Sequence, residues 1–309
     1  MLFGRVKPLD AILATAEKKS LTRTLGALQL TMLGIGAIIG TGIFVLTAAA
    51  ADKAGPAMMI SFIIAAIVCG LAALCYSELA AMVPVSGSAY TYSYATFGEI
   101  VAWIVGWALV LEYAIAASAV SVGWSGYMVS LVEEVFKTDI PNTFVKGPFD
   151  PVGVGETAGL INVPAMLIGL VCMALLIVGT KESARFNAVL VAIKVSALAL
   201  FLVLALPAVT SDNFAPFMPN GFFANEVLDP ITNNMVTVGV SAAAASIFFA
   251  YVGFDAVSTA AEETINPQRN IPIGLIGSLG ICTVIYLLVA AGAIGTIGAQ
   301  PGGALAQSD

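Results

Sequence analysis

The chain has 309 residues, of which 59% are hydrophobic and 10% charged, and its mean hydropathy is +0.98. Soluble domains carry roughly 25% charged residues, so this composition excludes an ordinary soluble domain and predicts an all-α membrane protein. Histidine is absent, which excludes histidine proton relays, histidine-based catalytic triads and the common zinc sites. The net charge of −7 comes largely from acids between the hydrophobic stretches, where we expect solvated surface and no nucleic-acid partner.

The chain begins with a polar leader at 1–24, after which long hydrophobic stretches follow one another. A helix needs about 20 apolar residues to cross a hydrocarbon core of ~30 Å. The stretch after the leader is too long for a signal peptide and lacks a small-residue cleavage site. Seven stretches are long enough to span a membrane: 25–50, 57–82, 98–131, 161–179, 186–207, 237–261 and 272–297.

The basic residues predict how these spans are oriented, because Lys and Arg are retained in cytoplasmic loops. We therefore expect a multi-pass protein of the plasma (inner) membrane with its N-terminus in the cytoplasm. In this arrangement the cytoplasmic basic residues are Arg5, Lys7, Lys18, Lys19, Arg23, Lys181, Arg185 and Arg269, and the outer ones are Lys53, Lys137 and Lys146.

The segments between the spans carry no separate soluble domain, so the function must reside in the helix bundle. Residues 84–99 are polar, aromatic and free of Lys and Arg, and we expect a re-entrant or interfacial connection there. Residues 132–160 and 208–236 are rich in Pro, Asn, Asp and Gly and are expected to be outer loops. The four cysteines lie within predicted spans and are interpreted as small buried hydrophobic residues: Cys69, Cys75, Cys172 and Cys282.

Two spans are interrupted in their middles by glycine motifs. The first reads Gly-Ile-Gly-Ala-Ile-Ile-Gly-Thr-Gly-Ile-Phe at 34–44, and the second reads Phe-Phe-Ala-Tyr-Val-Gly-Phe-Asp at 248–255. A helix unwound at mid-bilayer leaves backbone groups unpaired, which is tolerated only where they line a cavity or hold a ligand. Paired interruptions of this kind indicate the binding site of a secondary transporter.

The two interruptions offer opposite chemistry. The first exposes successive backbone N–H groups at the start of a half-helix, whose positive end suits a carboxylate; these are the N–H groups of Gly40, Thr41 and Gly42. The second offers unpaired carbonyls between Phe249 and Val252, which suit an ammonium group. Together they describe a site for a zwitterion.

Glycine spacing alone leaves other interpretations open. Gly36 and Gly40 are four residues apart, as in the packing seams of membrane helices. On spacing alone, such a seam is the more common meaning of this pattern. A dinucleotide fingerprint is disfavoured, because the spacing is Gly-x-Gly-x-x-x-Gly and no strand precedes it.

Ionisable residues within spans form the second informative group, since each costs from ~2.5 kcal/mol upward at the bilayer centre. Lys194 and Glu112 both lie mid-span, and Asp255 follows the second interruption. A lysine desolvated in a pocket can take up and release a proton, so we interpret Lys194 as a functional residue. The alternative is a structural Lys–Glu pair that neutralises both charges. Glu262 and Glu263 are expected at the cytoplasmic surface or in a gate.

Four segments together resemble one known family. They are 34–44, the 84–113 segment with Ser-Gly-Ser-Ala-Tyr-Thr-Tyr and Gly-Trp-Ala-Leu-Val-Leu-Glu-Tyr, 249–263, and 263–272 with Glu-Thr-Ile-Asn-Pro-Gln-Arg-Asn-Ile-Pro. The chain resembles the amino acid–polyamine–organocation superfamily and, more narrowly, a bacterial member of its cationic amino acid transporter branch. The resemblance implies the leucine-transporter-type fold, with two inverted repeats of five helices and broken first and sixth helices at the site.

The resemblance also implies roles for individual residues. The N–H groups that bind the substrate carboxylate are those of Gly40, Thr41 and Gly42, and the carbonyls that receive the α-amino group are those of Ile38, Phe249 and Val252. Lys194 corresponds to the fifth-span lysine that replaces a sodium ion in proton-coupled relatives, and Glu112 lies near the same network. The implied partners are an amino acid, protons and the lipid bilayer, with a proton gradient and no cofactor as the driving force.

Relatives of this kind have about twelve or more spans, whereas seven are predicted here. The predicted organisation is a complete first repeat at 25–207, then an outer loop and the first two helices of a second repeat at 208–309. We therefore expect a C-terminally truncated permease that moves amino acids by proton-coupled symport with alternating access. The alternatives are a non-transporting membrane fragment or scaffold and an amino acid/polyamine exchanger. A channel is disfavoured because no filter sequence appears, and an enzyme because no catalytic constellation does.

Overall fold

The computed structural model describes residues 6, 8, 23–148, 159–178, 180–228 and 235–307, with the backbone alone at 41, 178 and 180–188. Most of the predicted leader at 1–24 lies outside the described residues, as do residues 149–158 of the expected outer loop at 132–160. The helices are α2 (Ala27–Ile38), α3 (Thr41–Ala54), α4 (Met58–Met82), α5 (Ser88–Thr96), α6 (Glu99–Phe136), α7 (Asn142–Val145), α8 (Val163–Val178), α9 (Thr180–Ala205), α10 (Val240–Ile247), α11 (Ala256–Thr259) and α12 (Pro267–Ile297). Short 3-10 turns are η1 (Gly55–Ala57), η2 (Leu206–Ala208), η3 (Ser211–Phe214), η4 (Phe248–Tyr251) and η5 (Ala261–Glu263).

Helices dominate the described chain, and the expectation of an all-α membrane protein is confirmed. By length and composition, five helical segments can cross a membrane: Gly42–Met82, Glu99–Phe136, Val189–Ala208, Val240–Thr259 and Pro267–Ile297. Two shorter apolar helices, Ala27–Ile38 and Val163–Ile177, fall below that length. The seven predicted stretches do not correspond one to one to these segments, because α2 and α3 divide the first stretch, and α3, η1 and α4 together form the segment Gly42–Met82.

Proline and glycine set several of the helix boundaries. Helix α4 ends at Met82 because Pro84 disfavours helical backbone at the residue before it, and Val83 has φ −128° and ψ 76°. Gly98, with φ +93°, separates α5 from α6. At the other end of the chain, Pro267 occupies the first turn of α12, where its missing N–H costs nothing.

The chain divides into two compact units. Unit 1 contains residues 1–108 and 197–308, and unit 2 contains 109–196. The predicted boundary between the two repeats, at 207/208, concerns internal symmetry and not compact units. It stays a prediction.

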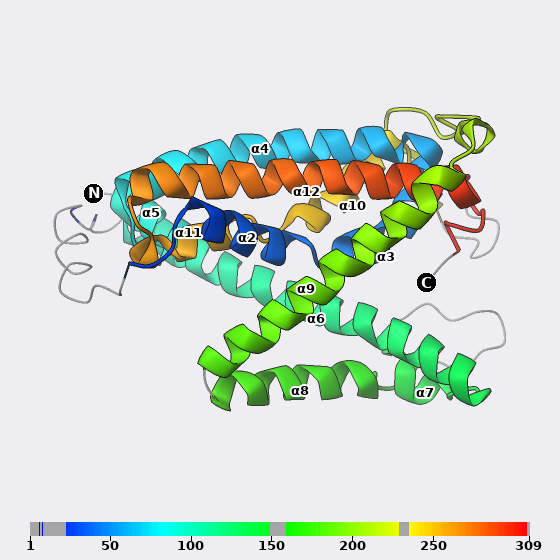
Figure 1. Ribbon diagram of the computed structural model, residues 1–309, viewed down its shortest axis with the longest axis horizontal. Helices are drawn as coiled ribbons and strands as arrows, with labels where there is room; N and C mark the ends of the chain where they lie inside the picture. The colour runs from blue at the N-terminus through cyan, green and yellow to red at the C-terminus, as the bar shows by residue number, and fades with distance from the viewer. Residues whose placement is uncertain are drawn as a thin grey trace. The chain divides into compact units, whose positions relative to one another are not determined.

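Unit 1 is built around α12, which packs along both α2 and α4, while α10 packs against α3 and α4. Figure 1 shows α4 and α12 side by side over much of their length. Small residues allow the close approach: a Cβ added at Gly274 would lie 2.7 Å from the Cβ of Leu30. The fully buried side chains between these helices include Phe62, Leu275 and Tyr286.

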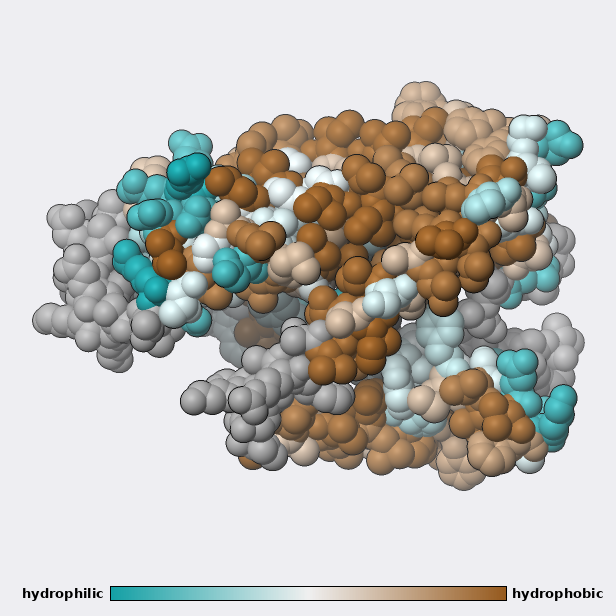
Figure 2. Space-filling model, viewed as in Figure 1, coloured by the Kyte–Doolittle hydropathy of each residue, from teal (hydrophilic) through white to brown (hydrophobic). Residues whose placement is uncertain are grey.

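The outer face of α4 and α12 is apolar. Leu71 of α4 is 62% exposed and Val284 of α12 is 58% exposed, and hydrophobic residues cover this face of unit 1 in Figure 2. Hydrophilic residues gather near the two ends of these helices. An exposed apolar face between polar ends is stable in the hydrocarbon core of a bilayer, which is consistent with a membrane-spanning unit.

Unit 2 contains most of α6 together with α7, α8 and most of α9. Asn162 ties two of these helices together, because its side-chain oxygen accepts hydrogen bonds from Ser125 Oγ on α6 (2.6 Å) and from the N–H of Ala165 in α8 (3.0 Å). Ser125 is fully buried. The amide of Asn162 therefore caps α8 and joins it to α6 at the same time.

Segment 84–99, expected to be a re-entrant or interfacial connection, contains the helix α5, and its re-entrant or interfacial character stays a prediction. Two other expectations need correction. The expected loop at 208–236 leads into two antiparallel strands, β1 (Asn225–Leu228) and β2 (Met235–Val238), so a small hairpin accompanies the helices. Cys75 and Cys172 are exposed, because they face outward from α4 and α8, whereas Cys69 and Cys282 are buried as expected.

Candidate functional site

The first glycine motif contains a break between two helices. Helix α2 ends at Ile38, the backbone is extended at Ile39 (φ −70°, ψ 92°) and irregular at Gly40 (φ −126°, ψ −150°), and α3 begins at Thr41. The N–H groups at the start of a helix lack partners within that helix. The residues predicted to bind a carboxylate therefore stand at the N-terminus of α3, with the Thr41 side chain outside the described atoms.

The glycines of this motif have different surroundings. A Cβ added at Gly42 would lie 2.5 Å from the Cα of Ala250, and one added at Gly34 would collide with Ser278. A Cβ added at Gly40 would meet only the carbonyl oxygen of Ile38, at 4.0 Å. The close packing expected of a glycine seam thus occurs at Gly34 and Gly42, whereas Gly40 has space beside it.

The second motif also interrupts a helix. Helix α10 ends at Ile247 and gives way to the 3-10 turn η4, after which Val252 is extended (φ −56°, ψ 137°) and Gly253 has φ +112°. The carbonyl of Phe249, predicted to receive an ammonium group, accepts a hydrogen bond of 3.3 Å from the N–H of Val252 and keeps its second lone pair.

The two breaks lie against each other. Gly42 contacts Ala250 as described above, and a Cβ at Gly253 would lie 2.8 Å from the carbonyl oxygen of Ala37. Glycine is required at 253 for two reasons, namely its positive φ and this contact with the backbone of α2. The structure therefore brings Ile38, Gly42 and the 249–252 turn together from positions about 200 residues apart.

A tyrosine that the sequence interpretation missed joins the breaks. The hydroxyl of Tyr286 on α12 lies 2.9 Å from the carbonyl oxygen of Ile38 and 3.1 Å from that of Ala250. Tyr286 is fully buried. The available signal was a tyrosine within a strongly apolar span, since a buried tyrosine hydroxyl needs a hydrogen-bond partner.

The two residues predicted to couple protons lie in unit 2. Lys194 is on α9 and Glu112 is on α6, and both side chains are half-buried. Each takes part in an interaction within the structure. Their role in coupling stays a prediction.

A group of polar contacts joins α5 to the chain that follows the second break. The backbone N–H and the hydroxyl of Ser86 both donate to Glu262 Oε1, at 3.0 and 3.1 Å. Ser258 donates to the carbonyl of Asp255 at 2.6 Å, so the 2.9 Å contact between Ser88 and Ser258 is donated by Ser88. The expectation that Glu262 belongs to a gate is compatible with this position.

Tyr92 extends the same group of contacts into the interior of unit 1. Among the described residues its buried hydroxyl has no hydrogen-bond partner. Burial raises the pKa of Tyr92 to about 12, an effect that the nearby Ser258 hydroxyl partly opposes. Tyr92 is therefore a neutral phenol at every physiological pH.

We expect Glu262→Gln to loosen α5, because it replaces a charged acceptor of two hydrogen bonds by a neutral one. Hydrogen bonds to charged groups contribute about 1 kcal/mol more than neutral ones, so amide exchange around Ser86 should accelerate roughly five-fold. Hydrogen–deuterium exchange measures this. The matched control is Glu263→Gln, an exposed neighbour, which should leave exchange at Ser86 unchanged. Equal acceleration in both variants would contradict the expectation.

The other end of the broken helices is joined by Lys53, at the end of α3. Its ammonium donates to Ser246 Oγ on α10 at 2.7 Å, and its carbonyl accepts the N–H of Gly239 at 2.8 Å. The side-chain amide of Asn220 also donates to this carbonyl, at 3.0 Å. Lys53, expected only as an outer loop residue, thus connects α3 to the helix that contains the second break.

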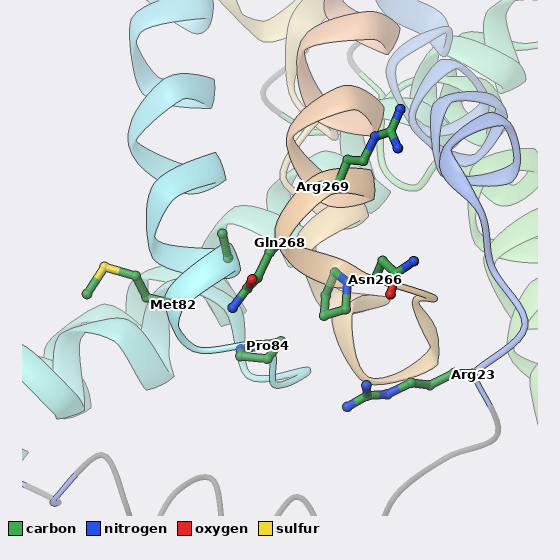
Figure 3. A pocket seen from close by; sticks show the side chains of 8 residues that line it. Arg23, Met82, Pro84, Asn266, Gln268 and Arg269 are labelled. Atoms are coloured by element: carbon green, nitrogen blue, oxygen red, sulfur yellow. The ribbon is translucent and has the colours of Figure 1, made fainter.

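A cavity of about 580 Å³ lies away from the breaks, between the end of α4 and the start of α12. Its lining residues are Arg23, Ala81, Met82, Pro84, Asn266, Pro267, Gln268 and Arg269. Figure 3 shows the Arg269 side chain turned away from Met82 and Gln268. The Arg23 and Arg269 side chains therefore do not converge on one point of the cavity.

Comparison with known proteins adds independent information. A family profile described as "Amino acid permease" matches residues 25–300. The chain is 47% identical over 287 residues to a methylthioribose transporter and 49% identical over 296 residues to the branched-chain amino acid permease BcaP, both of Bacillus subtilis (strain 168). It is 39% identical over 271 residues to the chloroplastic cationic amino acid transporter 9 of Arabidopsis thaliana.

The alignments cover most of this chain but only part of its relatives. They include 92%, 96% and 87% of the chain, in the order given above. They include 58%, 60% and 44% of the relatives. The chain thus spans less than two thirds of the length of these proteins. Both helix breaks fall within residues 25–300, which the family profile matches.

Proposed function

The chain belongs to the amino acid permease family, and from this premise we propose that its two helix breaks bind an amino acid for secondary active transport across the plasma membrane. The observation that carries the proposal is the contact between the breaks, in which Gly42 lies against Ala250 and Tyr286 bridges Ile38 and Ala250. This contact puts the start of one half-helix beside freed carbonyls of another. A zwitterion has a carboxylate for the N-terminus of the half-helix and an ammonium group for the carbonyls.

The carboxylate end of the proposed site is the N-terminus of α3. The N–H groups of Gly40, Thr41 and Gly42 belong to its first turn and to the residue before it, where the helix dipole favours an anion. The space beside Gly40 supports this assignment, because a side chain there would fill the approach to these N–H groups.

The ammonium end is formed by carbonyls. Ile38 ends α2, and Phe249 and Val252 lie in and directly after η4, so their carbonyls are not all committed to helix bonds. Each carbonyl oxygen has two lone pairs, and the bond that Phe249 accepts from the N–H of Val252 uses one of them. A substrate ammonium can use the other.

We propose that Lys194 and Glu112 couple this transport to protons, with symport as the mode and no further cofactor. The support is their half-buried position on helices of an apolar chain, where charged groups are costly and mark proton or ion pathways. We further propose a cytoplasmic N-terminus. The Ser86–Glu262 contact then lies at the cytoplasmic end and acts as part of an inner gate.

A binding experiment tests the proposed function. We expect L-valine, or another member of a panel of L-amino acids, to bind the purified protein in calorimetry. L-Valinamide should bind at least about ten-fold more weakly, because the N-terminus of α3 then has no anion to receive.

Methylthioribose is the informative competitor, since one relative is named for its transport. It has neither a carboxylate nor an ammonium group, so we expect it to bind less well than the amino acid. Binding of L-valine and its amide with equal affinity, or binding of methylthioribose alone, would refute the zwitterion site.

A further inference from the structure

Tyr286 is held in a fixed orientation at the point where the two breaks meet. Its ring packs edge-on against Phe62, with 5.9 Å between the ring centroids, and at a tilt against Tyr251, with 5.3 Å. Phe62 is on α4 and Tyr251 is in η4, so two other elements pack against the ring. Since the side chain is fully buried, the ring is held in place, and the hydroxyl hydrogen can move only by rotating about the C–O bond.

The hydroxyl faces one carbonyl from each break. The oxygen of Ile38 belongs to the last residue of α2, and the oxygen of Ala250 belongs to η4. A buried carbonyl without a partner is costly. A tyrosine hydroxyl has one proton, so it donates fully to one of these oxygens at a time.

We propose that Tyr286 is a positioning residue that presents the Ile38 carbonyl to the substrate ammonium and passes its own hydrogen bond to Ala250 when the ammonium arrives. The inference rests on the proposed function, because it concerns the same site. It adds a side chain from α12 to a site otherwise made of backbone groups.

The exchange follows from the relative strengths of the donors. Without substrate, the hydroxyl donates preferentially to Ile38, the nearer oxygen at 2.9 Å. An ammonium group is a stronger donor than a neutral hydroxyl, so it takes over the Ile38 carbonyl. The hydroxyl then rotates to the Ala250 oxygen, 3.1 Å away, and neither carbonyl is left without a donor. The protein therefore admits the ammonium without exposing an unsatisfied backbone group.

The test compares two ligands that differ only in the amino group, L-valine and 3-methylbutanoate. Tyr286→Phe keeps the ring and removes the hydroxyl. We expect its affinity for L-valine to fall about ten-fold, while its weaker affinity for 3-methylbutanoate stays within about two-fold of the wild type. A merely structural role for the hydroxyl would lower both affinities alike, which would overturn the inference.

Ser61→Ala is the matched control. It removes a hydroxyl of α4 that is equally buried and also donates to a backbone carbonyl, that of Val240 at 2.8 Å, which lies outside the two breaks. Its ratio of L-valine to 3-methylbutanoate affinity should equal that of the wild type. An equal change of this ratio in both variants would overturn the inference.

A second variant keeps the test decisive if Tyr286→Phe does not fold. Tyr286→para-aminophenylalanine supplies two N–H protons, enough to serve both carbonyls, and should keep the L-valine affinity within about three-fold of the wild type. Loss of L-valine binding in this folded variant would count against the inference. A wild-type protein that binds no amino acid of the panel would instead refute the proposed function.

Discussion

Gly42→Ala should weaken binding of the amino acid at the two breaks. The added Cβ would lie 2.5 Å from the Cα and 2.7 Å from the Cβ of Ala250, and backbone cannot move aside as a flexible side chain can. Overpacking of this kind costs about 1–3 kcal/mol, and the two breaks would have to separate to relieve it. We expect a roughly 5–150-fold fall in affinity for the amino acid and a lower melting temperature. Calorimetry and a thermal-shift assay measure the two quantities.

Two other glycines supply the controls. Gly40→Ala places its Cβ no nearer than 4.0 Å to the Ile38 oxygen, so the melting temperature should be unchanged while amino acid binding weakens. Gly280→Ala, on the exposed face of α12 with no atom within 4 Å, should change neither quantity. A Gly42 variant that binds and melts like Gly280→Ala would show that the breaks do not need this contact.

The location of the breaks was predictable from the sequence because the physical requirement is local. An unwound segment inside an apolar span requires residues that tolerate unusual backbone angles, and Gly40 and Gly253 supply them in otherwise uniform hydrophobic runs. The end of α4 before Val83 and the separation of α5 from α6 at Gly98 follow from equally local preferences. These parts of the fold could be expected before any three-dimensional information.

The partners of the breaks could not be predicted in the same way, because they depend on contacts between distant segments. Nothing in the sequence near 286 indicates that this tyrosine reaches Ile38, 248 positions earlier. The Ser86–Glu262 contact, 176 positions apart, has the same character. Gly40 and Gly42 are two residues apart in one motif, and the sequence does not distinguish their roles. Only the structure shows that Gly42 packs against Ala250, whereas Gly40 has space beside it.

Lys194→Ala should uncouple accumulation from the proton gradient. If Lys194 carries the coupling proton, its removal leaves the backbone groups at the breaks intact but removes the charge that responds to pH. Coupling free energies are typically about 1–3 kcal/mol, so gradient-driven accumulation of the amino acid should fall by roughly 5–150-fold. Exchange of labelled for unlabelled amino acid at equal pH on both sides should persist. Uptake of labelled amino acid into proteoliposomes, with and without an imposed pH gradient, measures the accumulation and the exchange.

Glu112→Gln is the comparison that assigns the role to the lysine. Glu112 and Lys194 are both half-buried residues of unit 2, so both variants disturb a similar environment. A supporting residue should shift the pH dependence of uptake without removing the response to the gradient, whereas the lysine variant should lose the response. If Lys194→Ala retains full gradient-driven accumulation, the residue is structural. In that event a structural Lys–Glu pair becomes the better account of both side chains. Pairing of the two charges offsets the free-energy cost of burying them, and neither group needs to change protonation during transport.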